Sequence, residues 1–198
     1  MKTILVGTRN NNKKKELEKL LKWLKVRILN LSDLDVDIPP VIEDGKTFRQ
    51  NAIKKALMCS RYTKGLVLAD DSGLVVDALG GKPGVRSARF ARTKADDSEN
   101  NAKLLRFMEN VPANKRQATF VSVAALAEDG HLIGTTEGQC GGSIGFELKG
   151  ENGFGYDPLF TPEGYKLTFA QLKPDFKNKI SHRGKALRKA REVIREYL

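Results

Sequence analysis

The segment MKTILVGTRNNNKKKELEKLLKWL, residues 1–24, determines the class of fold. Its first part, Lys2–Gly7, is a short apolar run of the kind that forms a buried strand. A polar loop, residues 8–13, follows it. Beyond the loop, apolar residues recur with helical spacing at Leu17, Leu20, Leu21, Leu24 and Ile28. A strand, a polar loop and a helix in this order predict the start of an α/β unit.

Later segments add further helices and strands. Thr47 opens a second expected helix, with Gln50 in the capping-box position. Helices are also expected over Asp96–Val111 and after Ser181, and strands over Leu66–Ala69, Gln117–Ala127 and His131–Gly138. The Asp129-Gly130 dipeptide predicts a hairpin between the last two strands. The whole pattern predicts an α/β fold with a partly antiparallel sheet.

The composition narrows the class of protein. A chain of 198 residues has the size of a single domain, with room for a small lobe. Hydrophobic residues make up 40% and charged residues 30%, which excludes a disordered tail and a membrane protein. The net charge of +11 attracts nucleic acid, a membrane surface or free nucleotides, without choosing among them. Cys59 and Cys140 belong to no Cys-x-x-Cys or Cys/His cluster, so a soluble, reducing compartment is expected.

The loop after the first strand contains the pattern Thr8-x-Asn10-x-x-Lys13. Free backbone N–H groups at a helix N-terminus, together with the helix dipole, favour a phosphate there. Thr8 and Asn10 add neutral donors, and Lys13 adds a positive charge. The loop lacks the glycines of a Walker A motif. An ordinary helix N-cap followed by solvated lysines explains the same residues, so this pattern alone leaves both interpretations open.

A second pattern, Asp70-Asp71-Ser72-Gly73, follows the strand expected over Leu66–Ala69. Adjacent carboxylates on a strand point to opposite faces. One of them can bind a hard cation or activate water while the other orients the loop backbone, and such oxygen ligands suit Mg²⁺. Glu43, in an acidic loop, is a candidate for a second carboxylate ligand. The alternative is an ordinary Asp-Ser-Gly turn without a chemical role.

Two further patterns lie in the C-terminal third of the chain. In Gly153–Pro158, glycines flank two aromatic residues and Asp157, so a planar base can stack there and the carboxylate can bind the base or the ribose. Lys177, His182 and Arg183 lie around the start of the last helix, and arginine donates forked hydrogen bonds to carbonyl or phosphate oxygens. The structural alternative for Gly153–Pro158 is a turn with core aromatic residues. The alternative for the second of these two patterns is a helix N-cap with solvated basic residues.

All four patterns fit one ligand. They supply donors for phosphates, carboxylates for magnesium, an aromatic ring for a base and an arginine for a base carbonyl. This combination favours a nucleoside triphosphate over RNA. Aromatic residues make up only 7% of the chain, whereas non-specific RNA binders interleave surface aromatics with basic residues.

The same patterns identify a family. The chain resembles the inosine triphosphate pyrophosphatase family, the hydrolases of non-canonical purine nucleotides. The matching segments are Thr8-x-Asn10-x-x-Lys13-x-x-Glu16, Asp44-Gly45-x-Thr47-Phe48-x-x-Asn51-Ala52, Ala69-Asp70-Asp71-Ser72-Gly73-Leu74, Gly81-x-Pro83-Gly84-Val85-x-Ser87-Ala88-Arg89, Gly153–Pro158 and Lys177-Asn178-x-Ile180-Ser181-His182-Arg183. They follow the family order from residue 8 to residue 183, nearly the whole chain.

The resemblance implies a fold and a reaction. The fold would be α/β, with an elongated mixed β-sheet flanked by helices, and two lobes with an active-site cleft between them in one domain of residues 1–198. The reaction would be Mg²⁺-dependent hydrolysis of ITP, dITP or XTP to the nucleoside monophosphate and pyrophosphate, which removes these nucleotides from the pool. We expect a cytoplasmic homodimer, without membrane association or a stable nucleic-acid complex.

The resemblance also implies residue roles. Asp71 would accept a proton and bind Mg²⁺, Glu43 would share the metal, and Lys55 would reach the triphosphate as a second catalytic residue. The residues expected to bind substrate are Thr8, Arg9, Asn10, Asn11, Asn12 and Lys13 at the phosphates, Ser72 beside Asp71, and Phe154, Gly155, Tyr156, Asp157, Lys177, His182 and Arg183 at the nucleoside and base.

Two positions depart from the family pattern. Gln50 and Gln171 stand where the family usually has glutamate. Gln50 keeps a capping function but loses a charge, so metal affinity or pH optimum is expected to differ if that charge tunes Lys55 or the metal.

Two other functions stay open. One is a related pyrophosphatase for other modified bases, such as methylated or pyrimidine triphosphates. The other is a basic nucleic-acid-binding module without catalysis, which retained acidic metal residues disfavour because they repel a phosphate backbone.

Overall fold

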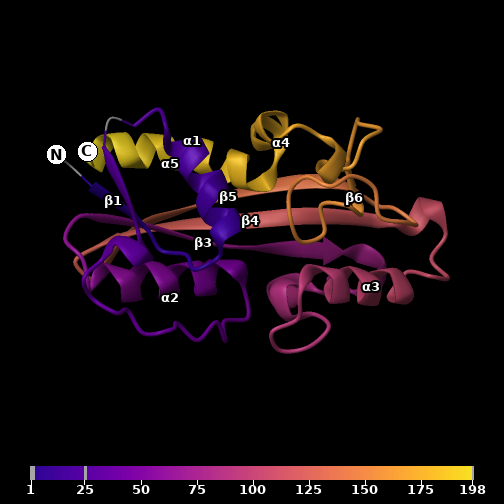
Figure 1. Cartoon of the computed structure of the whole chain (residues 1–198), viewed down its shortest axis with the longest axis horizontal. Coiled ribbons are helices and arrows are strands. Elements are labelled where there is room, and N and C mark those ends of the chain that lie inside the picture. The colour runs from indigo at the N-terminus through magenta and orange to yellow at the C-terminus, as the bar shows by residue number, and fades with distance from the viewer. Residues whose placement is uncertain (1–2, 25, 198) are drawn as a thin grey trace. The chain divides into compact units, whose positions relative to one another are not determined.

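A computed structural model describes residues 3–24 and 26–197 of the chain. The chain folds as two compact units: the first comprises Met1–Asp71, Ser122–Gly138 and Arg183–Leu198, and the second Ser72–Val121 and Gln139–His182. Six strands form one sheet in the order β2-β1-β3-β4-β5-β6 (Figure 1). The strands are β1 (Thr3–Val6), β2 (Arg27–Asn30), β3 (Leu66–Val76), β4 (Gln117–Glu128), β5 (His131–Ile144) and β6 (Phe160–Pro162). The helices are α1 (Asn11–Leu21), α2 (Phe48–Ser60), α3 (Asp97–Phe107), α4 (Pro174–Ile180) and α5 (His182–Tyr197).

The sheet is mixed, which confirms the expected fold class. In the first unit, β1 pairs in parallel with β2 and with β3, so that Ile4 lies opposite Ile28 on one side and Leu66 on the other. In the second unit, β5 pairs with β6 in the antiparallel direction, with Ile144 opposite Phe160. Parallel and antiparallel pairs in one sheet, with helices packed against it, are typical of an α/β protein.

Both faces of the parallel strands in the first unit are covered by helices (Figure 1). Alternate residues of a strand point to opposite faces. One face packs against α1 and α5 through Ile4, Val6, Leu66, Leu68, Ala124 and Leu126. The other packs against α2 through Ala69, Val123, Ala125 and Ala127. Burial on both faces explains why β1 is a continuous apolar run in the sequence.

The order in which strands are added to the sheet reverses at β1. It passes from β1 through α1 to β2, and then through α2 to β3 on the other side of β1. The two helices lie on opposite faces of these strands. In open α/β sheets, ligands bind at the carboxyl ends of the strands where the order reverses in this way. The topology therefore points to the ends of β1 and β3 as the place to search for a site.

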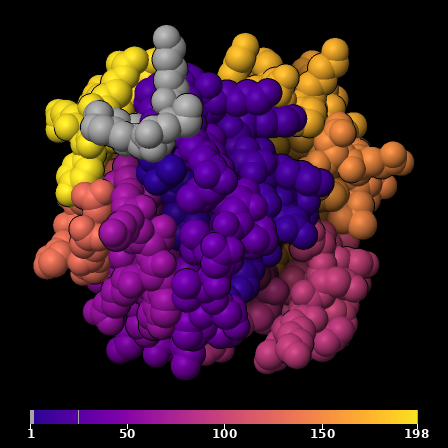
Figure 2. Space-filling model, turned by 60° about the vertical axis from the view of Figure 1, so that its left-hand side comes forward, coloured from indigo at the N-terminus to yellow at the C-terminus, as the bar shows by residue number. Residues whose placement is uncertain are grey.

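Local signals predicted several elements correctly. Thr47 caps α2, and Gln50 completes the capping box with it, as expected. Asp96 caps α3 in the same manner. The hairpin between β4 and β5 turns at Asp129 and Gly130, which have φ of 48° and 79°. Gly130 donates to Ser60 Oγ at 3.0 Å, and Figure 2 shows the turn, in salmon, beside the purple surface of earlier residues in the same unit.

The first predicted helix is too long, because it includes a strand. Helix α1 ends at Leu21, and Ile28 lies in β2. Both Leu24 and Ile28 nevertheless pack against the same apolar cluster as Leu17. They had the spacing of one helical face because a turn and a short strand return the chain to the cluster that the helix covers.

The strand predicted over Leu66–Ala69 is too short. Strand β3 continues through Asp70, Asp71, Ser72 and Gly73 to Val76, so these residues form no turn. Asp70 and Asp71 are both buried, at 2% and 5% exposure. Charged residues are tolerated inside a buried strand only when they are paired, and the site described below supplies their partners.

The second unit has an aromatic core under α3. Phe120, Phe160 and Phe169 contact one another, with ring centroids 4.7–5.9 Å apart. Leu104 of α3 and Met108, which follows the last residue of this helix, pack against this cluster. Helix α4 was not predicted, because its seven residues, PDFKNKI, carry no apolar stripe. Within residues 3–24 and 26–197, no helix has the length and apolar composition needed to cross a membrane.

Candidate active site

A cluster of charged side chains lies in the first unit around the middle of β3. It joins carboxylates and cations from β3, from helices α1, α2 and α5, and from the loop before α2. Its members are the carboxylates of Glu16, Glu43, Asp70 and Asp71 and the cations of Lys13, Lys55 and Arg183. When all are ionised, four carboxylates against three cations leave the cluster with a formal charge of −1, although the whole chain carries +11.

Asp70 is the centre of one half of this cluster. Its Oδ2 lies 3.2 Å from Lys13 Nζ and accepts a hydrogen bond from Arg183 Nε at 3.3 Å. The same guanidinium also donates to Glu16 Oε2. Burial by itself works to raise the pKa of Asp70, but the charges of Lys13 and Arg183 outweigh it and lower the pKa. Asp70 is therefore a fixed negative charge that ties α1 and α5 to β3.

Asp71 lies in a different environment one residue further along the strand. Lys55 Nζ donates to its Oδ1 at 3.2 Å, and Asn51 Nδ2 donates to its Oδ2 at 3.1 Å. Lys55 also donates to Glu43 Oε1 at 3.0 Å. Burial raises the pKa of Asp71, and the nearby Glu43 carboxylate adds to the effect, against the opposing charges of Lys55 and Lys13.

The two neighbouring carboxylates thus have pKa values shifted in opposite directions. Asp70 has a lowered pKa and Asp71 a raised one. Divergent environments of this kind separate a permanently charged group from one that accepts a proton more readily. Of the two, Asp71 has the environment of a proton acceptor.

The residues around Lys55 fit a divalent cation. Glu43 and Asp71 place carboxylate oxygens within 3.2 Å of one ammonium group, so both can contribute to a single cation position. Mg²⁺ commonly takes one or two carboxylates and completes its shell with waters and substrate phosphates. Among the described residues, no group of three or more His, Cys, Asp or Glu side chains could hold a metal by itself. The donor set therefore suits a metal that shares its ligands with a phosphorylated substrate.

The phosphate loop, Thr8–Lys13, sends its side chains in several directions. Asn10 caps α1, since its Oδ1 accepts from the backbone N–H of Asn12 and of Lys13 at 3.0 Å. The N-cap interpretation of this loop is therefore correct for Asn10, while Lys13 turns to Asp70. Because the cap occupies two of the N–H groups at the start of α1, side chains carry more of any phosphate binding here.

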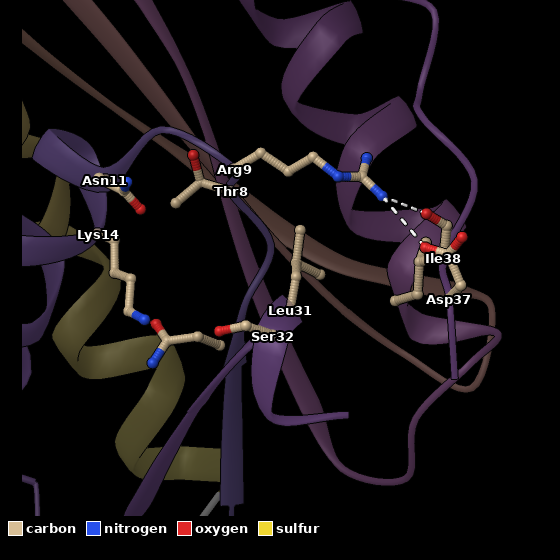
Figure 3. Close-up of a pocket in the computed structure, with 9 residues that line it drawn as sticks. Thr8, Arg9, Asn11, Lys14, Leu31, Ser32, Asp37 and Ile38 are labelled. Atoms are coloured by element: carbon tan, nitrogen blue, oxygen red, sulfur yellow. Dashed lines mark hydrogen bonds and ion pairs between the residues drawn. The ribbon is translucent and has the colours of Figure 1, made fainter. Parts of the chain in front are cut away.

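Other residues of this loop border a pocket of about 300 Å³ (Figure 3). The pocket lies at the carboxyl ends of β1 and β2, and its lining includes Thr8, Arg9 and Asn11. In Figure 3, Arg9 extends across to Asp37 and to the carbonyl of Ile38, to which it donates. Thr8, Arg9 and Asn11, three of the residues predicted to bind phosphate, thus line this pocket. Asn12 is exposed at the start of α1.

The remaining predicted residues form a second group in the second unit. Lys177 Nζ lies 2.6 Å from Asp157 Oδ2, and both side chains are buried. The same oxygen accepts from the backbone N–H of Phe154 at 2.9 Å. Lys177 Nζ also lies 5.0 Å from the centroid of the half-buried Phe154 ring. An aromatic ring, a carboxylate and an ammonium therefore lie together on Gly153–Pro158 and α4.

Some predicted residues have other surroundings. Tyr156 is buried in the core, and its hydroxyl donates to the Ser87 carbonyl at 2.8 Å. His182 stacks on Phe120 with ring centroids 4.6 Å apart, and is 3% exposed. Arg183, the next residue, contacts Asp70 and Glu16 in the cluster of the first unit. Ser72 follows Asp71 directly in β3 and is partly exposed.

Sequence reasoning gave no role to Asn51, which is fully buried. Its Nδ2 donates to Asp71, and its Oδ1 accepts from the backbone N–H of Gly45 at 2.8 Å. It thereby links the carboxylate of Asp71 to the loop that carries Glu43. The available signal was its position four residues before Lys55 on α2, since residues with this spacing share one face of a helix.

The fold and the cluster define a class of protein. It is an α/β protein whose acidic residues and lysines, at a topological switch point, are suited to a phosphorylated ligand and a hard cation. The model of the Ham1 family matches residues 4–193, and the chain belongs to this family.

Similar proteins agree with this assignment. The chain is 54% identical over 191 residues to a dITP/XTP pyrophosphatase of Desulforamulus reducens, covering 96% of this chain and 94% of that protein. It is 44% identical to one of Clostridium tetani, covering 100% and 98%. It superimposes on a HAM1 protein structure from Coxiella burnetii with a TM-score of 0.87 and 38% identity, covering 99% of this chain and 100% of that one. The family resemblance of the sequence is confirmed.

Asp70→Asn is expected to lower the free energy of unfolding by about 3–5 kcal/mol at pH 7, because Lys13 and Arg183 lose the charge that compensates them. Since folding lowers the pKa of Asp70, its contribution is present above the ordinary value of about 4 and is lost as the pH falls through the folded value. Urea denaturation of the variant and the original chain at pH 7 and about pH 3 measures both effects.

Asp44→Asn is the control for that experiment. Asp44 pairs with Lys54 at the surface, with side chains 64% and 46% exposed. An exposed pair contributes little to stability because solvent screens it, so this variant is expected to stay close to the original chain. Equal losses in the two variants, or a difference for Asp70→Asn that does not shrink in acid, would contradict the role assigned to Asp70.

Gly153→Ala is expected to disturb the group around Asp157. A Cβ at this position would lie 2.0 Å from Asp157 Oδ2, on a backbone with φ of 78°. Clash and backbone strain together predict a loss of about 2–4 kcal/mol in the free energy of unfolding. Gly164→Ala, with φ of 80° and nothing within 4 Å of the added Cβ, isolates the strain and is expected to lose about 1 kcal/mol. Similar losses in urea denaturation would show that the contact with Asp157 contributes nothing.

Proposed function

We propose that this chain is a nucleoside triphosphate pyrophosphohydrolase that converts dITP, ITP and XTP to the monophosphate and pyrophosphate. The observation that carries the proposal is that the carboxylates of Asp71 and Glu43 both lie within 3.2 Å of the Lys55 ammonium. It is supported by the family and by the names of relatives that are 44–54% identical to the chain. Because its substrates are free nucleotides, the proposal places the activity in the cytoplasm.

In the proposed mechanism, Asp71 accepts a proton from the water that attacks the α-phosphorus. Hydrogen bonds from Lys55 and Asn51 fix the orientation of this carboxylate for proton transfer. Lys55 stays protonated, because the carboxylates of Asp71, Asp70 and Glu43 raise its pKa against the opposing effect of burial. Lys55 and Lys13 then offset the charge that develops on the phosphate oxygens. Attack at the α-phosphorus makes pyrophosphate the leaving group.

Glu43 and Asp71 are proposed to hold the Mg²⁺ ion. When bound, this ion supplies charge neutralisation at the phosphate oxygens and orients the triphosphate. Side chains of the phosphate loop, Thr8–Lys13, and Ser72 are proposed to bind the phosphates. Arg183 acts in this proposal through Asp70, because its guanidinium is bound by that carboxylate and by Glu16.

The base is proposed to bind at the group formed by Phe154, Asp157 and Lys177, and His182 is proposed as a further contact of the base. A purine can stack on the Phe154 ring. Hypoxanthine and xanthine have a 6-keto oxygen, which accepts a hydrogen bond from a donor such as the Lys177 ammonium. The 6-amino group of adenine presents a donor there instead, and an unmatched group costs about 1–3 kcal/mol. The proposal treats residues 1–198 as a single domain.

A product assay tests the proposed reaction. The purified chain is incubated with ITP, dITP, XTP, GTP, ATP and dUTP, with Mg²⁺ or with a chelator, and pyrophosphate and phosphate are measured separately. We expect pyrophosphate from ITP, dITP and XTP, and loss of the reaction with chelator. Phosphate as the product would mean attack at the γ-phosphorus. Preference for dUTP would favour a related pyrophosphatase that acts on other nucleotides. A sedimentation measurement on the same sample tests the proposed homodimer.

Asp71→Asn is expected to lower kcat by about 10²–10⁴-fold, the usual contribution of a general base. The amide keeps the shape of the carboxylate, so the far-ultraviolet circular dichroism is expected to change little, whereas the urea midpoint is expected to fall because Lys55 keeps only Glu43 as a carboxylate partner. Asp77→Asn, an exposed aspartate that follows the same strand, is the control and is expected to keep full activity. Near-normal turnover by Asp71→Asn would remove Asp71 from the mechanism.

A further inference from the structure

The backbone N–H and the backbone carbonyl of Gly155 are both bound by side chains of α3. Asp97 Oδ2 accepts from the Gly155 N–H at 2.7 Å, and Asn101 Nδ2 donates to the Gly155 carbonyl at 2.8 Å. The two side chains are four residues apart and so lie on one face of the helix. We call Asp97 and Asn101 the Gly155 clamp. All three residues belong to the second unit.

The orientation of the Asn101 amide is fixed by its contacts. Its Nδ2 also donates to the backbone carbonyl of Asp97 at 2.8 Å, so both amide hydrogens point at carbonyl oxygens. A flipped amide would place its own oxygen against the same two carbonyls. The side chain is 4% exposed, and its Oδ1 is buried without a hydrogen-bond partner among the described residues. Leaving a buried acceptor unpaired costs free energy, so the position is not optimised for stability alone.

Gly155 lies between the two residues that the proposed function assigns to the base. Phe154 precedes it, and Asp157 follows two residues later and accepts from the Phe154 N–H. Gly155 has φ of 63°, so the chain reverses here in a left-handed conformation. Rotation of the Gly155 peptide would move the Phe154 ring relative to the Asp157 carboxylate and the Lys177 ammonium. Holding this peptide therefore fixes the geometry of the whole group.

We propose that Asp97 and Asn101 are positioning residues that set base selectivity through Gly155. This inference rests on the proposed function, because the base is assigned to Phe154 and Asp157 there. Neither clamp side chain needs to touch the nucleotide. The clamp holds the Phe154 ring and the Asp157–Lys177 pair in place before the base binds. This lowers the free-energy cost of binding a base that matches them.

The neighbouring Asn100 provides a matched control. It is 3% exposed, and its Oδ1 accepts from the Ala91 N–H at 2.8 Å while its Nδ2 donates to the Ala88 carbonyl at 3.4 Å. Asn100 and Asn101 are thus adjacent buried asparagines that each bind two backbone groups. They differ in the segment that they hold: residues 88–91 for Asn100 and Gly155 for Asn101.

The experiment compares Asn101→Ala and Asn100→Ala in steady-state kinetics with ITP and with ATP. For Asn101→Ala we expect KM for ITP to rise about tenfold and the ITP/ATP ratio of kcat/KM to fall about tenfold, the equivalent of one buried hydrogen bond. Its kcat for ITP is expected to stay within about twofold, because the reacting groups are untouched. Asn100→Ala is expected to lose similar thermal stability and to keep the ratio. Equal ratios in the original chain and both variants would overturn the inference.

Asp97 gives a second test that does not depend on a buried substitution. Asp97 is exposed at the start of α3, so Asp97→Ala is expected to fold. It should shift the ITP/ATP ratio in the same direction as Asn101→Ala, and Asp97→Asn, which keeps an oxygen to accept from Gly155, should restore it. A ratio that Asp97→Ala leaves unchanged, or that Asp97→Asn fails to restore, counts against the clamp.

Hydrogen exchange separates failure of the clamp from failure of the proposed function. The Gly155 amide is expected to exchange faster in Asp97→Ala and Asn101→Ala, and at the original rate in Asn100→Ala. If the original chain hydrolyses no ITP, the proposed function is wrong, and the base selectivity assigned to the clamp falls with it. If the chain hydrolyses ITP but exchange and selectivity are unchanged in both clamp variants, the function stands and the clamp is refuted.

Discussion

A negative charge is buried on β3 in the first unit, and compensation of this charge constrains the elements around it. A carboxylate that is 2% exposed costs several kcal/mol unless cations and hydrogen bonds surround it. Asp70 obtains its cations from opposite ends of the sequence, Lys13 on α1 and Arg183 on α5. Glu16 then balances the second positive charge by binding the same guanidinium. The positions of both helices on this face of the sheet follow from the contacts of one side chain, in addition to their apolar packing.

The alternation of a strand divides the charged cluster into two parts with different chemistry. Side chains of adjacent strand residues point to opposite faces, so one step from Asp70 to Asp71 leads from the face of α1 and α5 toward that of α2. On the first face two cations meet one carboxylate, and the pKa is lowered; on the second, burial and Glu43 prevail, and it is raised. A single strand thereby supplies a structural charge and a candidate base without any change of backbone conformation.

The sequence predicted those features that depend on near neighbours. The cap at Thr47 and the turn at Asp129-Gly130 follow from local signals. Strand β2 could not be predicted in this way, because Ile28 has helical spacing by coincidence. The continuation of β3 past Ala69 could not be predicted either, because Asp70-Asp71-Ser72-Gly73 has the composition of a turn. Only partners distant in sequence make two aspartates stable inside a strand. The roles of Asn51 and Asn101 also depend on such partners, although the spacing of four residues between Asn51 and Lys55 was a local signal for Asn51.

The order of segments in the first unit has a consequence for the chain during its synthesis. This unit contains both the first strand and the last helix, and Ile4 and Val6 share an apolar cluster with Leu187, Ala190 and Ile194. At a translation rate of about 5–20 residues per second, roughly 10–40 s separate the appearance of β1 from that of α5. Throughout that interval the apolar face of β1 lacks part of its cover. This unit therefore cannot close before α5 has been synthesised, and until then the nascent chain has an exposed apolar strand that chaperones can bind.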